Sequence, residues 1–315
     1  MNCSVFRLSS PLGATVLIQC ALVAGVLCLG SVAAAAELKA VKIGSRIDVT
    51  VGGDFFTSYR FSADEKYPFF FPVNGPSGAS VTSMRNGQFP HHSSLFFGCD
   101  KVNGGNYWQE GNERGQILSD GAVIVTAAGP EIVITDGCRW QRPGAEAPIR
   151  DSRRIVISAP SAALRRIDFE ITLESLLAVT IEKTNHSLFS VRMDPDLTPA
   201  MGGTMINAAG VSGEKGTFGQ PSPWMACYGQ RGGGESEGLA VLQHPGNRWA
   251  TAAWFTRDYG FMSPTPMYWP PDGVRVVLAK GEKVTLRYRV LVFAGDPAKT
   301  DFSRHYADYS ARTNP

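Results

Sequence analysis

The chain has 315 residues, of which 43% are hydrophobic and 18% are charged, and its formal net charge is +2. The net charge is close to neutral and the sequence contains no basic run, so we expect no nucleic-acid partner. Beyond residue 36 no apolar stretch approaches the length of a membrane-spanning helix, so we expect no membrane partner for the remaining chain either.

Residues 1–36 have the layout of a secretory signal peptide. Arg7 is the only charge before an apolar run that ends in four alanines, and Glu37 opens the polar chain. The small-residue end favours cleavage. The alternative is a retained anchor, because the run is near the length of a span. We therefore expect residues 37–315 to form a single domain that is secreted or periplasmic.

The first half of the remaining chain consists of short extended patterns separated by turn residues. Alternating runs at 41–51 and 55–61 flank Gly52 and Gly53, which is typical of a hairpin. Residues 67–73 are bracketed by prolines, which favours an edge strand or a strand end. Further extended patterns lie at 95–97, 107–108, 116–118, 122–126, 131–135, 153–158, 167–173 and 177–182.

The second half is less uniform. Residues 194–238 are rich in Gly, Pro, Ser and Met, which suits either a linker or long ordered loops across one face; Phe218 and Trp224 need burial and favour loops. Residues 161–168 suit one helical turn and 302–309 a short helix. Extended patterns return at 238–245, 250–257, 274–278 and 284–293.

Strands at intervals of about 8 to 12 residues, with no sustained helical period, predict an all-β fold. We expect a large antiparallel β-sandwich with little helix. In 284–293 the polar residues Thr285, Arg287 and Arg289 alternate with apolar ones, so one face of this strand should be wet.

Three cysteines follow residue 36, namely Cys99, Cys138 and Cys227, and none forms a C-x-x-C pair. A disulfide between Cys99 and Cys138 is one reading for an exported protein. Buried free thiols that behave as small apolar side chains are the favoured one.

Several segments together carry a family resemblance. In order they are FPHHSSLFFG, KVNGGNYW, SLFSVRM, GGTMINAAG, GEKGTFGQPSPWMACYG, GLAVLQHPGN and GEKVTLRYRVLVFAGD. They resemble, over residues 65–310, an exported bacterial family labelled methane oxygenase PmoA. The methane monooxygenase subunit of that name is a multi-helix membrane protein, and residues 37–315 contain no segment that could span, so we do not expect that activity.

The resemblance implies a secreted β-sandwich without an established activity. Similar long sandwiches occur in galactose-mutarotase-like sugar enzymes, so the fold can be a supersandwich of that kind, with carbohydrate as ligand by fold analogy. The chain departs from the family pattern at Phe89, Ser93 and Gln243, which stand for His, Arg and Asp. An arginine fork and an aspartate that steers a histidine are therefore absent at these positions.

Histidines are the main catalytic candidates. His91 and His92 precede an apolar strand, and in extended backbone only one of them would enter a cleft as proton donor or acceptor. The alternative is a buried histidine beside an exposed one. If the loop of His244 meets them, the histidines form an acid–base pair or bind a divalent metal. No H-x-H or H-x-x-x-H spacing exists, so we predict no metal and no other cofactor.

Other polar and aromatic residues complete the predicted site. Glu110, Glu214 and Asp258 are candidate bases or hydroxyl acceptors, or else solvated loop acids, and Glu214 is the one we assign to catalysis. The predicted substrate-binding residues are Asn103, Trp108, Asn207, Trp254 and Arg257. Each has a competing interpretation. The asparagines can serve turns, and Arg257 can form a structural ion pair. Two of the four tryptophans at 108, 224, 254 and 269 can be core residues.

These residues predict an enzyme that uses histidine acid–base chemistry on a saccharide, as a hydrolase, lyase or epimerase. The alternative is a non-catalytic protein that binds a glycan or interacts with the cell envelope. No Walker, Rossmann or G-x-S-x-G motif is present, so we expect a small-molecule or oligosaccharide ligand without a nucleotide cofactor.

Overall fold

Alternation of buried and solvent-facing side chains governs most of the chain. The computed structural model describes residues 36–87 and 89–311. Strand β10 (Glu131–Gln141) is typical, because every second residue from Ile132 to Trp140 is buried. A period of two buries one face of a sheet. The predicted signal peptide lies, apart from Ala36, outside the described residues, so its cleavage and the export of the protein stay predictions.

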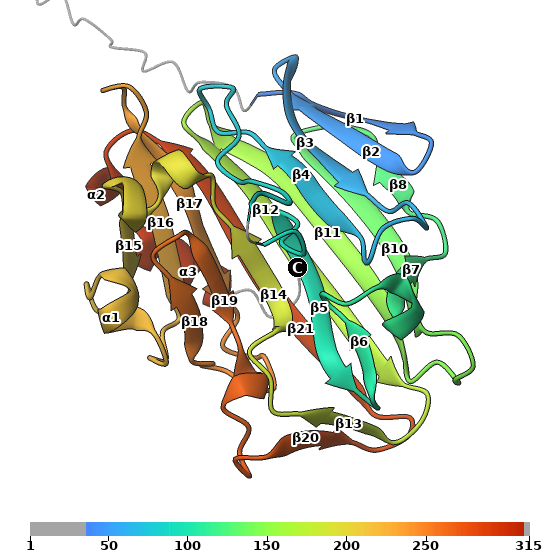
Figure 1. The fold of residues 1–315 in the computed structure, drawn as a ribbon. Coiled ribbons are helices and arrows are strands. Elements are labelled where there is room, and N and C mark those ends of the chain that lie inside the picture. The colour runs from blue at the N-terminus through green and yellow to red at the C-terminus, as the bar shows by residue number, and fades with distance from the viewer. Residues whose placement is uncertain (1–35, 88, 312–315) are drawn as a thin grey trace, which may run out of the picture. The chain divides into compact units, whose positions relative to one another are not determined.

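Two large antiparallel sheets contain these strands (Figure 1). The first has twelve strands, and its main path runs β18-β19-β14-β5-β4-β3-β2-β1-β9. Its strands are β1 (Leu38–Ile43), β2 (Arg46–Val51), β3 (Asp54–Arg60), β4 (Phe69–Val73), β5 (Leu95–Val102), β6 (Gly105–Tyr107), β9 (Ala128–Gly129), β13 (Val179–Glu182), β14 (Ser187–Arg192), β18 (Trp254–Arg257), β19 (Phe261–Pro264) and β20 (Arg275–Leu278).

The second sheet has nine strands in the order β15-β16-β17-β21-β12-β11-β10-β7, and β8 pairs with β10. The strands not yet given are β7 (Gln116–Ser119), β8 (Val123–Thr126), β11 (Ile149–Ser161), β12 (Leu164–Ser175), β15 (Thr204–Asn207), β16 (Trp224–Gln230), β17 (Ser236–Gln243) and β21 (Lys283–Ala294). The helices are α1 (Gly213–Thr217), α2 (Pro297–Thr300) and α3 (Phe302–Ser310), with 3-10 turns at Asn112–Arg114, Pro195–Leu197, Pro199–Met201 and Pro266–Tyr268. The prediction of an all-β antiparallel sandwich with little helix is confirmed.

The core lies between the two sheets. Phe97 of β5 contacts Trp140 of β10 and Phe169 of β12, and Phe189 of β14 stacks on Tyr288 of β21 at 4.6 Å between ring centroids. These aromatic contacts join one layer to the other and bury large apolar areas. The sandwich therefore holds β5 and β14 rigidly against the second sheet.

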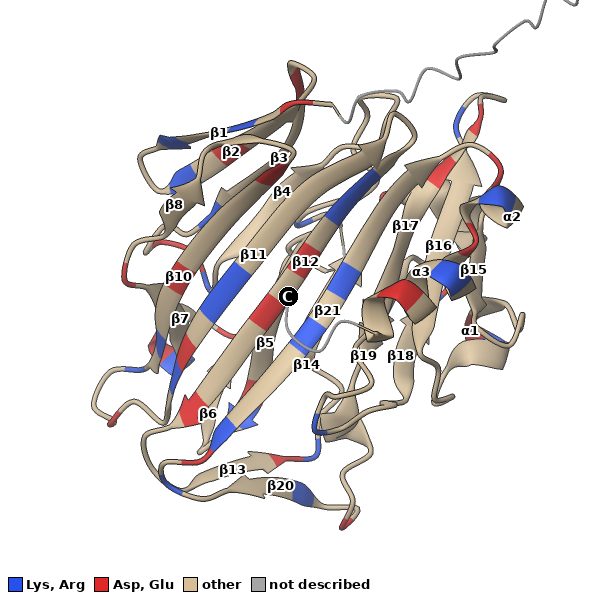
Figure 2. Cartoon of the chain, turned by 180° about the vertical axis from the view of Figure 1, so that it is seen from behind, with Lys and Arg blue, Asp and Glu red and all other residues tan. Residues whose placement is uncertain are grey.

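Helix α3 covers part of the outer face of the second sheet, where Figure 2 shows charged residues along β12 and β21. Phe302 and Tyr309 of α3 belong to a separate apolar cluster with residues of β16, β17 and β21. Arg289 is only 2% exposed, because Asp168 pairs with it and the Tyr309 ring lies over it. The predicted wet face of β21 is thus partly covered, and the terminal helix is confirmed.

Several local predictions were wrong. Residues 161–168 form the turn between β11 and β12 and the start of β12, because the long β11–β12 pairing continues to Ser161 and Leu164. The region 194–238 contributes β15 and β16 to the second sheet in addition to loops. Strand β4 pairs with both β3 and β5, so the edge alternative is wrong, whereas Pro68 directly precedes the strand and fits the alternative of a strand end.

The three cysteines of the described chain are buried and free, as favoured from the sequence. Within residues 36–87 and 89–311 no helix has both the length and the apolar character needed to cross a membrane.

Candidate functional site

Aromatic side chains gather on the face of the first sheet that points away from the second. Successive residues of β5 point to opposite faces, so Phe97 enters the core between the sheets while Phe96 lies outside it. The Phe96 ring stacks on Tyr67 at 4.9 Å and contacts Trp108 at 4.8 Å. This side of the sheet therefore carries buried aromatic rings next to the histidines that precede β5.

A carboxylate–imidazole pair lies on the same face. Ser187 of β14 pairs with Cys99 of β5, which places His186 opposite Asp100. The His186 Nδ1 atom is 3.1 Å from Asp100 Oδ2, and Asp100 is only 3% exposed. A buried carboxylate at Nδ1 holds the proton there and leaves Nε2 as the proton acceptor. The register of two strands thus builds a base from residues 86 positions apart.

His91 contacts this pair, and His92 contacts His91. Their ring centroids are 4.5 Å apart, and the His91 ring is 5.9 Å from that of His186. Both rings share one site because the backbone turns here, with the His92 N–H donating to Phe89 O. The rings pack together although the backbone is not extended, and only His91 lines the adjacent hollow, so the expectation that one of the two enters a cleft stays a prediction. We call His91, His92, His186, Phe89, Trp108 and Tyr259 the ring cluster.

Burial keeps two of these histidines neutral. It lowers the pKa of His91 from 6.5 to about 4, with a further contribution from His186. It lowers the pKa of His92 to about 2, with smaller contributions from His91, Arg192 and His186. The Nδ1 atom of His92 is buried and has no hydrogen-bond partner. Neutral imidazoles can each donate or accept a proton, so the cluster is equipped for proton transfer.

We expect His92 to make the protein sensitive to acid. In the unfolded chain the pKa of His92 returns to 6.5. Below that pH the unfolded chain binds more protons than the native protein, so the free energy of unfolding falls. Above pH 6.5 the full contribution of His92 to the free energy of unfolding is present. At ~1.4 kcal/mol per pKa unit, about 3 kcal/mol is lost between pH 7 and pH 4.

The measurement is urea unfolding of the wild type and of His92→Phe across this pH range. The phenylalanine keeps an aromatic ring between its neighbours and cannot bind the proton. The variant should lose less stability on acidification than the wild type does. Parallel loss in both proteins would show that His92 is not protonated on unfolding.

A hollow of about 340 Å³ opens beside the ring cluster. Its lining comes from three segments: Asp64, Glu65, Lys66, Tyr67; Arg85, Pro90, His91, Ser93; and Trp108, Gln109, Glu110, Asn112. The Tyr67 hydroxyl donates to His91 O at 2.7 Å and fixes the histidine backbone. Burial lowers the pKa of Lys66 to about 8. Glu110, one of the acids named from the sequence, is therefore brought to the same hollow as His91 and Trp108.

His244 lies in a different environment from the other histidines. It follows β17 of the second sheet, and its ring packs edge-on against Tyr309 of α3 at 5.1 Å. Its Nδ1 accepts from Gly246 N at 3.0 Å. Leu242, two residues earlier, belongs to the apolar cluster under α3. The structure therefore brings together His91, His92 and His186, and places His244 on the outer face of the other sheet.

Glu214 and Arg257 bind each other. Arg257 Nη1 is 3.1 Å from Glu214 Oε1, and the other carboxylate oxygen accepts from Asp258 N at 3.1 Å. The guanidinium also lies over the rings of Phe218 and Phe255. These contacts fit the structural ion pair that was the competing interpretation of Arg257.

The remaining predicted binding residues serve the backbone or the core, with one exception. Asn103 binds Ala178 O and Thr180 N through its amide, and Asn207 accepts from Ala209 N and Val211 N. Trp254 is fully buried, and its indole N–H donates to Ser222 O. Trp108 is also buried, yet it lines the hollow and its indole N–H has no partner.

Three residues of this region were not predicted to be functional: His186, Asp100 and Arg192. Each lies in or directly beside a segment quoted above, so a signal existed. His186 precedes SLFSVRM, Arg192 is within it, and Asp100 directly precedes KVNGGNYW. Their meeting depends on the pairing of β5 with β14, which no local pattern reveals.

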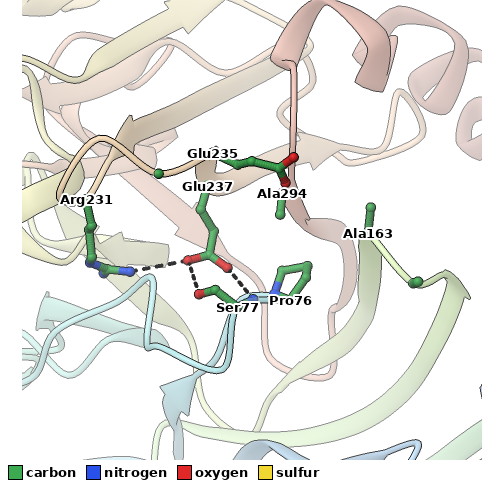
Figure 3. A pocket seen from close by; sticks show the side chains of 9 residues that line it. Pro76, Ser77, Ala163, Arg231, Glu235, Glu237 and Ala294 are labelled. Atoms are coloured by element: carbon green, nitrogen blue, oxygen red, sulfur yellow. Dashed lines mark hydrogen bonds and ion pairs between the residues drawn. The ribbon is translucent and has the colours of Figure 1, made fainter.

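A second hollow, of about 400 Å³, lies at another part of the fold (Figure 3). Its most buried acid, Glu237, already accepts from Ser77 N at 2.9 Å and Ser77 Oγ at 2.8 Å and pairs with Arg231. The carboxylate thus connects the loop that contains Ser77 to Arg231. Nothing in this lining resembles the histidine chemistry of the first hollow.

Metal binding was weighed from the sequence and not predicted. Among residues 36–87 and 89–311, no group of three or more His, Cys, Asp or Glu side chains is arranged to hold a metal ion.

Comparisons with known proteins place the chain in a family. Residues 46–307 match the model of a group described as "Family of unknown function (DUF6807)". No curated protein matches the chain.

Solved structures show weak similarity. A candidate aldose 1-epimerase from Klebsiella pneumoniae has 9% identity and a TM-score of 0.43, covering 88% of each chain. A galactose mutarotase related enzyme from Lactobacillus acidophilus has 10% identity and a TM-score of 0.30, and the match covers 82% of this chain and 98% of that chain. An alpha-galactosidase from Lactobacillus brevis has 10% identity and a TM-score of 0.29, and the match covers 82% of this chain and 40% of that chain. Scores this low carry no argument about activity.

Proposed function

The chain thus belongs to the DUF6807 family, whose description names no activity, and we propose from its site that it is an acid–base enzyme acting on a saccharide or sugar derivative. The observation that carries the proposal is the Asp100–His186 pair in contact with the neutral His91, which lines a hollow with Trp108. Buried titratable groups gathered at a hollow are the usual mark of catalytic chemistry.

The two imidazoles have different roles in this proposal. His186, with Nδ1–H held by Asp100, accepts a proton from a substrate hydroxyl or C–H group at Nε2. The Asp100 carboxylate then stabilises the imidazolium. His91 stays neutral and donates a hydrogen bond to the oxygen on which negative charge develops. This pair replaces the pairing with His244 that the sequence predicted.

The walls of the hollow suit a polyhydroxyl ligand. Trp108 borders the hollow as a buried ring, and its indole N–H has no protein partner. Asn112, Gln109 and Glu110 offer amide and carboxylate groups for hydroxyls. The lining is mostly polar, with Tyr67 and Trp108 as its aromatic members, and this composition suits a ligand rich in hydroxyl groups. Export of the protein, proposed from the leader, would place the enzyme where extracellular glycans are met.

The test is NMR of a panel of plant and algal mono- and oligosaccharides incubated with the purified protein in deuterated water. Epimerase or lyase chemistry appears as deuterium exchange or new double bonds, hydrolysis as new reducing ends, and anomer interconversion as faster equilibration. We expect saturable turnover of at least one class, and a loss of about 10²-fold or more in His91→Phe, which keeps the ring volume. Binding without turnover would instead support a glycan-binding protein.

A further inference from the structure

The guanidinium of Arg192 is buried without an anionic partner. Arg192 ends β14 and is 5% exposed. Its Nε and Nη1 atoms are buried and make no hydrogen bond, and Nη2 reaches Asn86 Oδ1 only at 3.4 Å. None of the ion pairs among the described residues includes this arginine. A charged group removed from water normally has hydrogen-bonded partners, and Arg192 lacks them, as Arg165 does elsewhere in the chain.

Two aromatic rings flank the guanidinium instead. The Tyr259 ring centroid is 4.4 Å from Arg192 Cζ, and that of Phe89 is 5.4 Å away. Arg257 provides the comparison within the same chain, because it too lies over two rings and yet has a carboxylate, Glu214, at 3.1 Å. Ring contacts offset part of the cost of burial but supply no hydrogen-bond acceptor to the N–H groups.

The unpartnered donors of Arg192 lie beside the proposed catalytic residues. The same two rings, Phe89 and Tyr259, stack on His92, at 5.0 Å and 6.3 Å. His92 Nδ1 is also buried without a partner, and the charge of Arg192 contributes to the low pKa of His92. A cation, an unpaired imidazole nitrogen and two aromatic faces are thus packed together next to His91.

We propose that Arg192 binds an anionic oxygen group of the substrate, a carboxylate or a sulfate on the saccharide. The inference rests on the proposed function for the saccharide and adds the charge of the substrate class. The oxygen atoms of a carboxylate or a sulfate accept hydrogen bonds from a guanidinium while neutralising it, which is the pairing that Arg192 lacks. Phe89 is half-buried above the guanidinium, so the anion enters where this ring lies.

Matched ligands test the proposal. Isothermal titration calorimetry compares methyl galactoside with methyl galacturonoside and galactose 6-sulfate, and the corresponding gluco series. We expect the better of the two anionic ligands to bind about 10 to 100 times more tightly than its neutral counterpart, as a charge-assisted hydrogen-bonded contact provides. Preference for uronate over sulfate, or the reverse, identifies the source of the anion.

Variants assign the preference to one side chain. Arg192→Met should remove the preference for the anionic ligand without lowering the melting temperature, because the wild-type charge is unpaired. Arg257→Met is the matched control, since it also removes a ring-flanked arginine, and it should retain the preference. Phe89→Ala should tighten binding of the anionic ligand and leave the neutral one unaffected or weaker.

The outcomes separate this inference from the proposed function. Turnover with equal affinity for neutral and anionic ligands overturns the anion site and leaves the enzyme. Anion-selective binding without any turnover keeps the role of Arg192 and rejects the enzyme. Failure to bind any of the anionic ligands, or selectivity that persists in Arg192→Met, overturns the inference.

Discussion

Replacement of His186 by alanine is expected to lower kcat/KM by about 10²- to 10⁴-fold, the usual contribution of a positioned general base. His186 is the imidazole whose Nδ1 is held by a buried carboxylate, and its ring also contacts Trp108 at 5.8 Å. Without it, no described group replaces the Nε2 acceptor between Asp100 and His91. The measurement is steady-state kinetics on the best substrate found by NMR.

Asp100→Asn separates catalysis from packing. The amide has nearly the same shape as the carboxylate, but it cannot stabilise an imidazolium and can hold the wrong tautomer. We expect a loss comparable with that of His186→Ala and a fold of unchanged stability within about 1 kcal/mol.

His305→Ala is the control for the loss of a histidine elsewhere in the chain. His305 lies on α3, on the outer side of the second sheet, and should leave the kinetics unchanged. Activity of His186→Ala within threefold of the wild type would refute the base assignment.

Asp151→Ala is expected to destabilise the protein by about 3–5 kcal/mol, the cost of leaving one member of a buried ion pair uncompensated. Asp151 is 1% exposed and accepts from Arg153 Nε at 2.8 Å and Nη2 at 3.2 Å. It also accepts from the indole N–H of Trp140 at 2.8 Å. The substitution therefore leaves a guanidinium and an indole unsatisfied between the two sheets. Urea unfolding with an unchanged m-value measures the loss.

A neighbouring ion pair provides the control. Arg150, directly before Asp151 on β11, pairs with Glu174 at 2.8 Å, but the two side chains are 56% and 27% exposed. Exposed pairs contribute little because water and salt screen them. Glu174→Ala should leave the urea midpoint almost unchanged. Equal effects of the two substitutions would contradict the role assigned to burial.

Local patterns predicted the strands and the loop that enters β5. The Gly52-Gly53 hairpin, the helix near residue 302 and the strand after the histidine pair follow from glycine conformation, periodicity and apolar runs, and all are present. The errors have a common cause. Strand β16 pairs with β15 and β17 although its region is rich in Gly, Pro and Met, and β4 lies between β3 and β5 despite its prolines. In both cases sheet pairing overrides weak local propensity.

The candidate site divides in the same way. His91, Trp108 and Glu110 were chosen from one span and do line one hollow, because residues near each other in sequence around a strand end remain near each other in space. The sequence analysis assumed that the loop of His244 meets these residues, but His244 follows β17 and its ring packs against Tyr309 of α3 instead. No spacing rule could have excluded that, since both assignments are strand ends in an all-β chain.

By itself the amino-acid sequence determined the all-β class, the antiparallel layers and the histidine-rich segment, because period-two burial and turn residues act over a few positions. The tertiary structure alone decided that Asp100 meets His186 and that Arg192 is buried among rings without an anion. Those contacts arise from strand register across 86 residues and more, and register is set by the packing of two whole sheets.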